Sequence, residues 1–344
     1  MDRPAPTGVA PEVLTRIREL IALQGGGAHE DLVADVMASA LKMLKDVHDR
    51  GDARLIATAI RELRYSFRLF EPYAERRKVS IFGSARTAAE REDYKLAQEA
   101  GRQLTAAGYM VITGAGAGIM QAGREGAGQE ISFALNIRLP WEQSANPVID
   151  GDEKLITFRY FFTRKLMFIR QSDAIVLFPG GFGTLDEGFE ALTLMQTGKS
   201  RVRPLILMER PGGTYWKSFD RYTREHLLGN GLISPDDLQL YQITHDPAEA
   251  VRWINRFYRN FHSARYVRDW FVIRLQRAPS PGAVAGLNED FADIMDPAGP
   301  LRPTGPLPEE KEDEEFPALP RVMFKFDRRQ HGRLRQLIDA LNGH

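Results

Sequence analysis

The chain has 344 residues, of which 43% are hydrophobic and 27% are charged, so it is long enough for one large or two modest domains with a buried core. Its 46 Lys and Arg residues balance 46 Asp and Glu residues, so no net charge attracts nucleic acid or anionic lipid to the whole protein. The sequence has no cysteine, which excludes disulfides, thiolate nucleophiles, Cys-ligated zinc and iron–sulfur clusters.

The first part of the chain, residues 1–76, is expected to be a helical extension. Between Pro11 and Ala74, apolar residues recur at helical spacing, with an interruption at Gly25-Gly26-Gly27. The opening MDRPAPTGVAPEVL lacks the basic and apolar regions of a secretory signal, and no apolar run approaches the ~18 residues of a membrane span. We therefore expect a cytoplasmic protein without a membrane partner.

The second part, residues 77–262, alternates between short apolar runs and amphipathic stretches. The apolar runs, typical of buried parallel strands, are 78–82, 109–113, 131–137, 174–178 and 204–208. The amphipathic stretches, typical of helices, are 93–107, 119–127, 161–171, 185–196 and 215–228. This alternation predicts an α/β fold, a Rossmann-like doubly wound parallel sheet with helices on both faces.

The third part, residues 263–344, is expected to be an irregular C-terminal extension, because the alternation ends there and Pro and Gly become frequent. Its acidic run, residues 309–315, is interpreted as a solvated linker. Its end, residues 321–341, is basic and amphipathic. The final segment, with Leu334, Leu337, Ile338 and Leu341, predicts a helix that docks on its own fold or on another subunit.

Three of the predicted strands end in glycine or small residues, at the edge where open α/β sheets bind ligands. Gly83-Ser84-Ala85-Arg86 follows the first strand, residues 114–118 (GAGAG) follow the second, and residues 179–187 (PGGFGTLDE) follow the fourth. Without Cβ atoms, backbone N–H groups can approach an anion closely, and the helix after each loop directs its positive end at the same place. The three loops together predict a phosphate site.

Two familiar nucleotide motifs are not matched. The loop at 114–118 departs from the dinucleotide fingerprint G-x-G-x-x-G, because the sixth position is Ile119, so a standard NAD site is not expected. The segment Thr197-Gly198-Lys199-Ser200 is not a Walker loop, because Thr193 stands where the first glycine is required.

The loop at 179–187 combines a glycine turn, the Thr184 hydroxyl and the Glu187 carboxylate three residues later. One alternative is that Glu187 merely complements the dipole at the start of its helix, but this does not explain the glycines. Upstream, the cationic pair Arg164-Lys165 stands among apolar residues, so at least one of the two is a candidate for the sheet edge, the alternative being a solvated helix face.

These residues resemble the LONELY GUY (LOG) family, the cytokinin-activating phosphoribohydrolases and their bacterial relatives, often mislabelled lysine decarboxylases. PGGFGTLDE matches the family signature PGGxGTxxE, Arg164-Lys165 stands at its RK motif, and TGAGAGIMQA (113–122) resembles its glycine-rich segment. The resemblance covers roughly residues 78–261. Ala115 stands where the family has glycine, a departure that costs little if the φ of this alanine is negative.

The resemblance implies hydrolysis of the N-glycosidic bond of a nucleoside 5′-monophosphate, AMP or an N6-modified AMP, to a free base and ribose 5-phosphate. It assigns catalysis to Arg164 and Glu187. It assigns phosphate binding to Gly180, Gly181, Gly183 and Thr184. Further substrate contacts are expected from Ser84, Gly114, Gly116, Gly118, Glu142, Lys165 and Thr193. It also implies a homodimer or a larger homo-oligomer.

The chemistry agrees with this assignment. Breaking the C1′–N bond builds positive charge on the ribose, which a carboxylate such as Glu187 stabilises while it orients or deprotonates water. A phosphate held at the start of the same helix fixes the ribose, so an unphosphorylated nucleoside is expected to be a poor substrate. Arg164 could pair with Glu187 and keep it ionised, and could bind a ribose hydroxyl or a phosphate oxygen.

No metal or organic cofactor is expected, because the seven histidines lack His-x-x-x-His spacing and no lysine is marked as a pyridoxal phosphate site. Two other functions stay open. A nucleotide-binding or sensing protein with little or no turnover would have no need of the Arg164 and Glu187 pair. A nucleic-acid-binding protein is disfavoured by the neutral charge, although residues 328–335 are basic.

Overall fold

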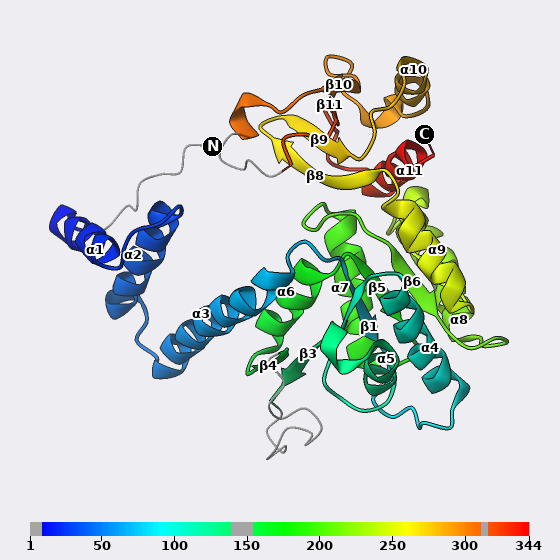
Figure 1. The fold of residues 1–344 in the computed structure, drawn as a ribbon, viewed down its shortest axis with the longest axis horizontal. Coiled ribbons are helices and arrows are strands. Elements are labelled where there is room, and N and C mark those ends of the chain that lie inside the picture. The colour runs from blue at the N-terminus through cyan, green and yellow to red at the C-terminus, as the bar shows by residue number, and fades with distance from the viewer. Residues whose placement is uncertain (1–8, 139–153, 311–315, 344) are drawn as a thin grey trace. The chain divides into compact units, whose positions relative to one another are not determined.

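The computed structural model describes residues 9–138, 154–310 and 316–343, and the chain divides into two compact units, Met1–Tyr65 and Ser66–His344. The first unit is helical, as predicted. It contains α1 (Pro11–Leu23), α2 (Glu30–Asp46) and most of α3 (Arg50–Phe70), which continues into the second unit (Figure 1). Within this unit, α1 packs against α2.

Seven parallel strands form the central sheet of the second unit, in the order β4-β3-β2-β1-β5-β6-β7. Their bounds are β1 Lys78–Phe82, β2 Met110–Thr113, β3 Ser132–Ile137, β4 Leu155–Phe158, β5 Ala174–Leu177, β6 Leu205–Met208 and β7 Gln242–Thr244. The doubly wound parallel sheet is thereby confirmed. The sequence missed β4 and β7, the two edge strands, because edge strands are partly exposed and lack a continuous apolar run.

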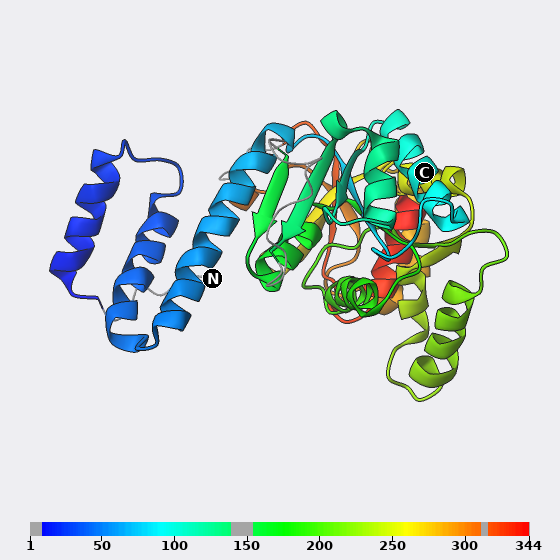
Figure 2. The same cartoon turned by 90° about the horizontal axis from the view of Figure 1, so that it is seen from below.

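Helices cover both faces of this sheet, and Figure 2 shows β3 and β4, in green, at one of its edges. The helices are α4 Glu92–Ala106, α5 Ile119–Ala127, α6 Phe161–Gln171, α7 Phe182–Gln196, α8 Tyr215–Tyr222 and α9 Pro247–Phe257, with a π-helical turn at Thr223–Leu228. Val79 and Ile81 of β1 share a core with α4, α5 and α9. On the other face, Phe82 packs against Phe168 of α6, with ring centroids 4.6 Å apart. The alternation of strand side chains thus fills two cores.

The strand order reverses between β1 and β5. Strands β1 to β4 build one half of the sheet and β5 to β7 build the other. At this switch point the two following loops touch, since the Ser84 backbone N–H donates to the Pro179 carbonyl at 3.1 Å. Open parallel sheets bind their ligands outside the carboxyl ends of the strands at such a point.

The C-terminal region is not irregular, which corrects the sequence analysis. It holds a four-stranded antiparallel sheet in the order β10-β11-β9-β8. The elements are β8 Phe261–Val267, β9 Trp270–Leu275, α10 Pro281–Asp290, β10 Arg302–Thr304, β11 Arg321–Phe324 and α11 His331–Leu341. Basic side chains such as Arg265 and Arg274 interrupt the apolar pattern of these strands, which is why the sequence did not reveal them.

The terminal helix docks on its own fold, which was one of the two predicted alternatives. Leu334, Leu337 and Leu341 of α11 are buried in one core with Phe257 of α9. The predicted helix is thus confirmed as α11, and the first residues of the basic end form β11.

The interpretation of the acidic run as a solvated linker is wrong at Glu310. Glu310 is only 3% exposed, and its carboxylate accepts hydrogen bonds from Arg274 at 2.9 Å and Arg321 at 3.1 Å. A buried carboxylate needs such partners, so Glu310, in a 3-10 turn, packs against strands β9 and β11 and is not part of a solvated linker. Residues 311–315 lie outside the described residues. Within the part of the chain that is described, no helix has the length and apolarity to cross a bilayer.

The close packing of α4 on α5 makes a stability prediction. A Cβ atom at Gly126 of α5 would collide with the backbone carbonyl of Gln98 in α4, whereas a Cβ atom at Gly286 of α10 would meet nothing within 4 Å. We expect Gly126→Ala to lower the free energy of unfolding by about 1–3 kcal/mol. Gly286→Ala is expected to leave it unchanged or raise it slightly. Urea unfolding of both variants measures this, and equal effects would contradict the packing argument.

Candidate active site

Glu187 lies deeper in its helix than the sequence suggested. Helix α7 begins at Phe182, after Gly181, and contains no acidic residue in its first turn. Glu187 is therefore in the second turn, where its side chain is only 7% exposed. An acidic residue that complements a helix dipole stands in the first turn, so the structural alternative for Glu187 does not hold.

One oxygen of the Glu187 carboxylate lacks a hydrogen bond from the described residues. Its Oε2 atom is buried and has no hydrogen-bond partner among the described residues. The nearest cation is Lys165, whose Nζ lies 3.7 Å from Oε2. Lys165 also pairs with Asp186 at 2.7 Å and with Glu190 at 2.9 Å, so its charge is shared among three carboxylates.

Burial raises the pKa of Glu187 to about 7, although Lys165 and Arg164 oppose the shift. The expectation that Arg164 pairs with this carboxylate and keeps it ionised is thereby corrected: the ion pair is with Lys165, and desolvation outweighs both cations. A carboxyl group with a pKa near neutrality can hold or release a proton at physiological pH.

Arg164 is held at the sheet edge from α6. Its Nε donates to the backbone carbonyl of Leu135 in β3 at 2.8 Å, and its guanidinium lies 5.1 Å from the ring of Phe168. A Cβ atom at Gly114 would collide with this guanidinium, so the glycine leaves the room that Arg164 occupies. Burial lowers the pKa of Arg164, and the nearby Glu187 counteracts that shift.

The three glycine loops meet around Ser84. The Ser84 carbonyl accepts a hydrogen bond from the Ile119 backbone at 3.1 Å, and a Cβ atom at Gly118, whose φ is +64°, would collide with it. A Cβ atom at Gly180 would collide with the Thr184 hydroxyl. Gly118 is required because another backbone approaches it, and Gly180 because the Thr184 side chain does.

The loop at 114–118 differs from one expectation. Ala115 has a φ of +23°, not a negative value, so the substitution of the family's glycine places an L side chain in a disfavoured conformation. The loop is turned tightly there, since the Gly116 N–H donates to the Gly114 carbonyl. Backbone strain thus lies beside the Arg164 guanidinium.

The remaining predicted site residues differ in what surrounds them. A Cβ atom at Gly181 or Gly183 would meet nothing within 4 Å, so these two glycines border open space, and Gly116 lies against Met120. Thr193 is exposed, more than one turn beyond Glu187 on α7. Glu142 lies outside the described residues.

Tyr215 is a site residue that the sequence analysis missed. Its hydroxyl donates to the Gly180 carbonyl at 2.6 Å, so the first residue of α8 holds the glycine loop in place. Its own N–H donates to the Glu209 carboxylate at 2.9 Å. A tyrosine in an amphipathic helix carries no sequence signal for this role. The acidic pair Asp186 and Glu190 could have been found, because i,i+4 spacing puts both on one side of α7.

The described residues were also compared with the arrangements that bind metal ions. Among residues 9–138, 154–310 and 316–343, no set of three His, Asp or Glu side chains is arranged to hold a metal ion.

Comparison with known proteins bears on this site. A family model described as possible lysine decarboxylase matches residues 115–254. The cytokinin riboside 5′-monophosphate phosphoribohydrolase of Mycobacterium tuberculosis is 27% identical over 165 residues, which cover 46% of this chain and 83% of that protein. The chain contains a LOG-family domain. This domain makes up about half of the chain.

Two further similarities concern the LOG-family domain. The pyrimidine/purine nucleotide 5′-monophosphate nucleosidase of Escherichia coli is 29% identical over 147 residues, 40% of this chain but only 32% of that protein. Among solved structures, the molybdenum cofactor carrier protein from Chlamydomonas reinhardtii is 20% identical, with a TM-score of 0.37, over 53% of this chain and 97% of that one.

The raised pKa of Glu187 predicts a pH-dependent stability. A carboxyl group whose pKa is about 7 in the folded protein and about 4.5 when unfolded destabilises the fold as it ionises. Relative to Glu187→Gln, wild type is expected to lose stability between about pH 4.5 and pH 7, by on the order of 3 kcal/mol, and no more above that.

Urea unfolding at pH 5, 6, 7 and 8 measures this difference. The control is Glu99→Gln on α4, because Arg102 and Gln103 lower the pKa of that carboxyl and it stays ionised throughout this range. Its difference from wild type is expected to be constant from pH 5 to pH 8. A constant difference for Glu187→Gln as well would show that burial does not raise the pKa of Glu187.

Proposed function

We propose that the LOG-family domain hydrolyses the N-glycosidic bond of a nucleoside 5′-monophosphate, AMP or an N6-modified AMP, to a free base and ribose 5-phosphate. The observation that carries this proposal is the buried Glu187 carboxylate, whose Oε2 has no hydrogen-bond partner among the described residues and which follows a glycine loop at the switch point of the sheet. The distant relatives named as phosphoribohydrolases and nucleosidases support it.

The phosphate would bind at the start of α7. The first N–H groups of a helix have no partner within the helix, and they attract an anion together with the helix dipole. Gly181 and Gly183 border open space there, and the Thr184 hydroxyl lies against the Gly180 backbone. Tyr215 would act as a positioning residue, since it holds the Gly180 carbonyl. Phosphate binding in this loop fixes the ribose relative to Glu187, five residues beyond the start of the helix.

Glu187 would act on the reacting atoms. As the C1′–N bond breaks, its electron pair leaves with the base and positive charge develops on C1′. The ionised carboxylate stabilises this charge and accepts a proton from the water whose oxygen bonds to C1′, while the departing base takes up a proton. A pKa of about 7 makes this carboxylate a stronger base than an ordinary glutamate while leaving much of it ionised at neutral pH.

The two cations would have different tasks. Arg164 is half-buried and bonded to the Leu135 carbonyl, with its guanidinium beside Gly114, and it would donate to a ribose hydroxyl or a phosphate oxygen. Lys165 would act as a positioning residue, because it holds Glu187 in an ion pair at 3.7 Å while Asp186 and Glu190 share its charge. No cofactor takes part in this scheme.

Release of free base tests the proposal. The substrates are AMP, GMP, CMP, UMP, dAMP and isopentenyl-AMP, with adenosine as the unphosphorylated control. We expect cleavage of at least one monophosphate, no cleavage of adenosine, and a loss of at least about 100-fold in kcat for Glu187→Gln, because the group that stabilises C1′ is removed. Below pH 7 the wild-type kcat/KM is expected to fall as Glu187 is protonated.

Glu99→Gln again serves as the matched control and is expected to keep full activity, since its carboxylate pairs with Arg102 on the surface of α4. If AMP binds but no monophosphate is cleaved, the enzyme proposal is wrong and the nucleotide-sensing alternative takes its place. Cleavage of adenosine at the rate of AMP would contradict the role of the phosphate.

We also propose that two copies of the chain associate beside this site. Phe182 at the start of α7 is 94% exposed, and Phe161 and Phe162 at the start of α6 are about half exposed. Exposed aromatic side chains are frequent at protein interfaces, and the neutral net charge favours a protein partner over nucleic acid.

The mass in solution tests this association. Light scattering is expected to give at least a dimer for wild type and a smaller species for Phe182→Ser, whose exposed ring is not needed for folding. Leu232→Ser, which removes an exposed apolar side chain after the π-helical turn, is the control and should keep the wild-type mass. A monomeric wild type would contradict the proposal.

A further inference from the structure

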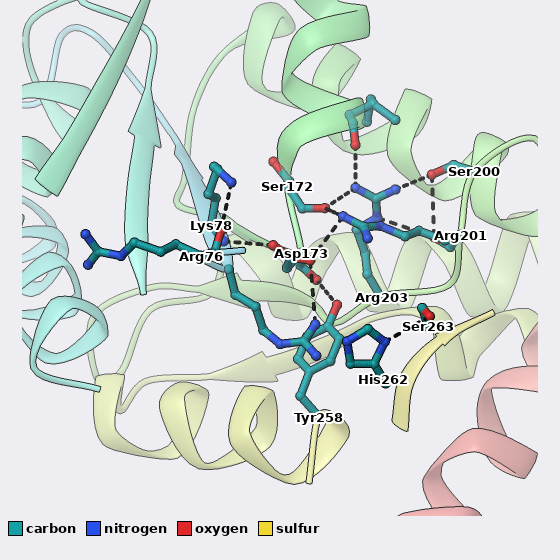
Figure 3. Close-up of polar contacts among 12 residues, drawn as sticks. Arg76, Lys78, Ser172, Asp173, Ser200, Arg201, Arg203, Tyr258, His262 and Ser263 are labelled. Atoms are coloured by element: carbon teal, nitrogen blue, oxygen red, sulfur yellow. Dashed lines mark hydrogen bonds and ion pairs between the residues drawn. The ribbon is translucent and has the colours of Figure 1, made fainter. Parts of the chain in front are cut away.

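A second group of charged side chains lies at the opposite end of the parallel sheet. Asp173 directly precedes β5 and Lys78 begins β1, so both lie at the amino ends of the strands, whereas Glu187 follows the carboxyl end of β5. Figure 3 shows Asp173 between Lys78 on one side and Arg201 and Arg203 on the other. We call Arg77, Lys78, Asp173, Arg201 and Arg203 the amino-edge cluster.

One carboxylate stands among four cations in this cluster. Asp173 accepts a hydrogen bond from the Lys78 backbone N–H at 2.8 Å, and it forms ion pairs with Arg201 at 3.1 Å and Arg77 at 3.7 Å. These pairs balance one positive charge. The cluster therefore carries an excess of about three positive charges.

The two most buried cations are held by uncharged groups. Arg203 is 3% exposed, and its guanidinium donates to the carbonyls of Ile169 and Ser172. The Lys78 ammonium donates to the carbonyls of Tyr73 and Arg76. The Ile169 and Ser172 carbonyls stand at the C-terminal end of α6, whose dipole offsets part of the Arg203 charge. This offset is smaller than that of a carboxylate, so a positive potential remains at this edge.

Burial and neighbouring cations both lower the pKa of the basic groups at this edge. Burial, together with Arg201, lowers the pKa of Lys78 and of Arg203, while Asp173 works against both shifts. On β8, burial lowers the pKa of His262, and Arg77 and Arg274 lower it further, against Glu75 and Asp173. Burial is the largest cause of each shift, and the neighbouring cations add to it.

Two of the cations reach solvent, Arg77 with 26% of its side chain exposed, and both are held in position. The Arg201 side chain is 46% exposed. The Arg77 guanidinium lies over the ring of Tyr258, 3.6 Å from its centroid, and the Tyr258 hydroxyl donates to the Asp173 carbonyl at 2.7 Å. A guanidinium held in this way loses little freedom when it binds a ligand, which favours affinity.

We propose that the amino-edge cluster binds a small anion that carries a diphosphate group, through Arg77 and Arg201, at a site separate from the glycine loops. Guanidinium groups pair with phosphate oxygens through parallel hydrogen bonds, and a diphosphate brings enough negative charge to balance the excess of the cluster. The His262 ring, half-buried and bonded to the Ser263 hydroxyl at 3.0 Å, adds a further nitrogen on the side of the C-terminal sheet (Figure 3).

Calorimetric titration with inorganic pyrophosphate and with inorganic phosphate tests this site on the full chain. We expect pyrophosphate to bind wild type more tightly than phosphate does, and Arg77→Gln and Arg201→Gln each to weaken pyrophosphate binding at least about 10-fold. Arg201→Lys is expected to weaken pyrophosphate binding by less than Arg201→Gln does, because lysine keeps the charge but cannot form the two parallel hydrogen bonds of a guanidinium. The control is Arg252→Gln, which removes an exposed arginine of α9 and should bind as wild type does.

Thr184→Ala separates the two sites, because it removes the hydroxyl of the glycine loop and should retain the binding that Arg201→Gln loses. The proposal is overturned if wild type takes up no pyrophosphate, if both arginine variants bind as wild type does, or if Thr184→Ala abolishes binding while Arg201→Gln retains it. Thermal unfolding of each variant without ligand confirms that it is folded. None of these readouts uses turnover, so they stand apart from the test of the hydrolase.

Discussion

The chemistry of the site depends on the burial of one carboxylate that has too few partners. Glu187 is removed from water, its Oε2 has no hydrogen bond from any described residue, and its nearest cation, Lys165, is shared with Asp186 and Glu190. Burial raises the pKa of Glu187 to about 7, and the charges of Glu190 and Asp186 add to the rise. Lys165 and Arg164 lower the pKa, but burial outweighs them.

Close backbone contacts give this carboxylate its place. Ser84 joins the loop after β1 to Pro179 in the loop after β5 and to the start of α5, and Gly118 and Gly180 permit these contacts because they lack side chains. The same glycines that would admit a phosphate also join the two halves of the sheet. Their presence in the sequence is therefore explained twice, by the architecture and by the proposed ligand.

Much of the fold could be predicted because buried parallel strands are continuous apolar runs, and five of them stand clearly in the sequence. The edge strands and the C-terminal sheet could not, since strands with one exposed face and charged side chains lack that signal. Glu310 shows the same limit, because a buried glutamate between two arginines looks like any other member of an acidic run.

The candidate site was predictable where a motif carries the chemistry, as at Arg164, Thr184 and Glu187. It was not predictable where the contact joins distant parts of the chain. Tyr215 reaches Gly180 across 35 positions, and the pairing of Glu187 with Lys165 instead of Arg164 depends on which neighbour in α6 turns towards α7. Such choices are made by tertiary packing, and one sequence does not record them.

Helix α6 runs from the carboxyl edge of the parallel sheet to its amino edge. Its first half carries Arg164 and Lys165. Near its end, the Ile169 carbonyl accepts a hydrogen bond from Arg203. The carbonyl of Arg203 in turn accepts a hydrogen bond from Arg335 of the terminal helix. Eleven residues span roughly 16 Å, with little freedom to bend over three turns. The length of this helix therefore fixes the separation between Arg203, at the amino edge of the sheet, and Lys165, which contacts Glu187 beyond the carboxyl edge.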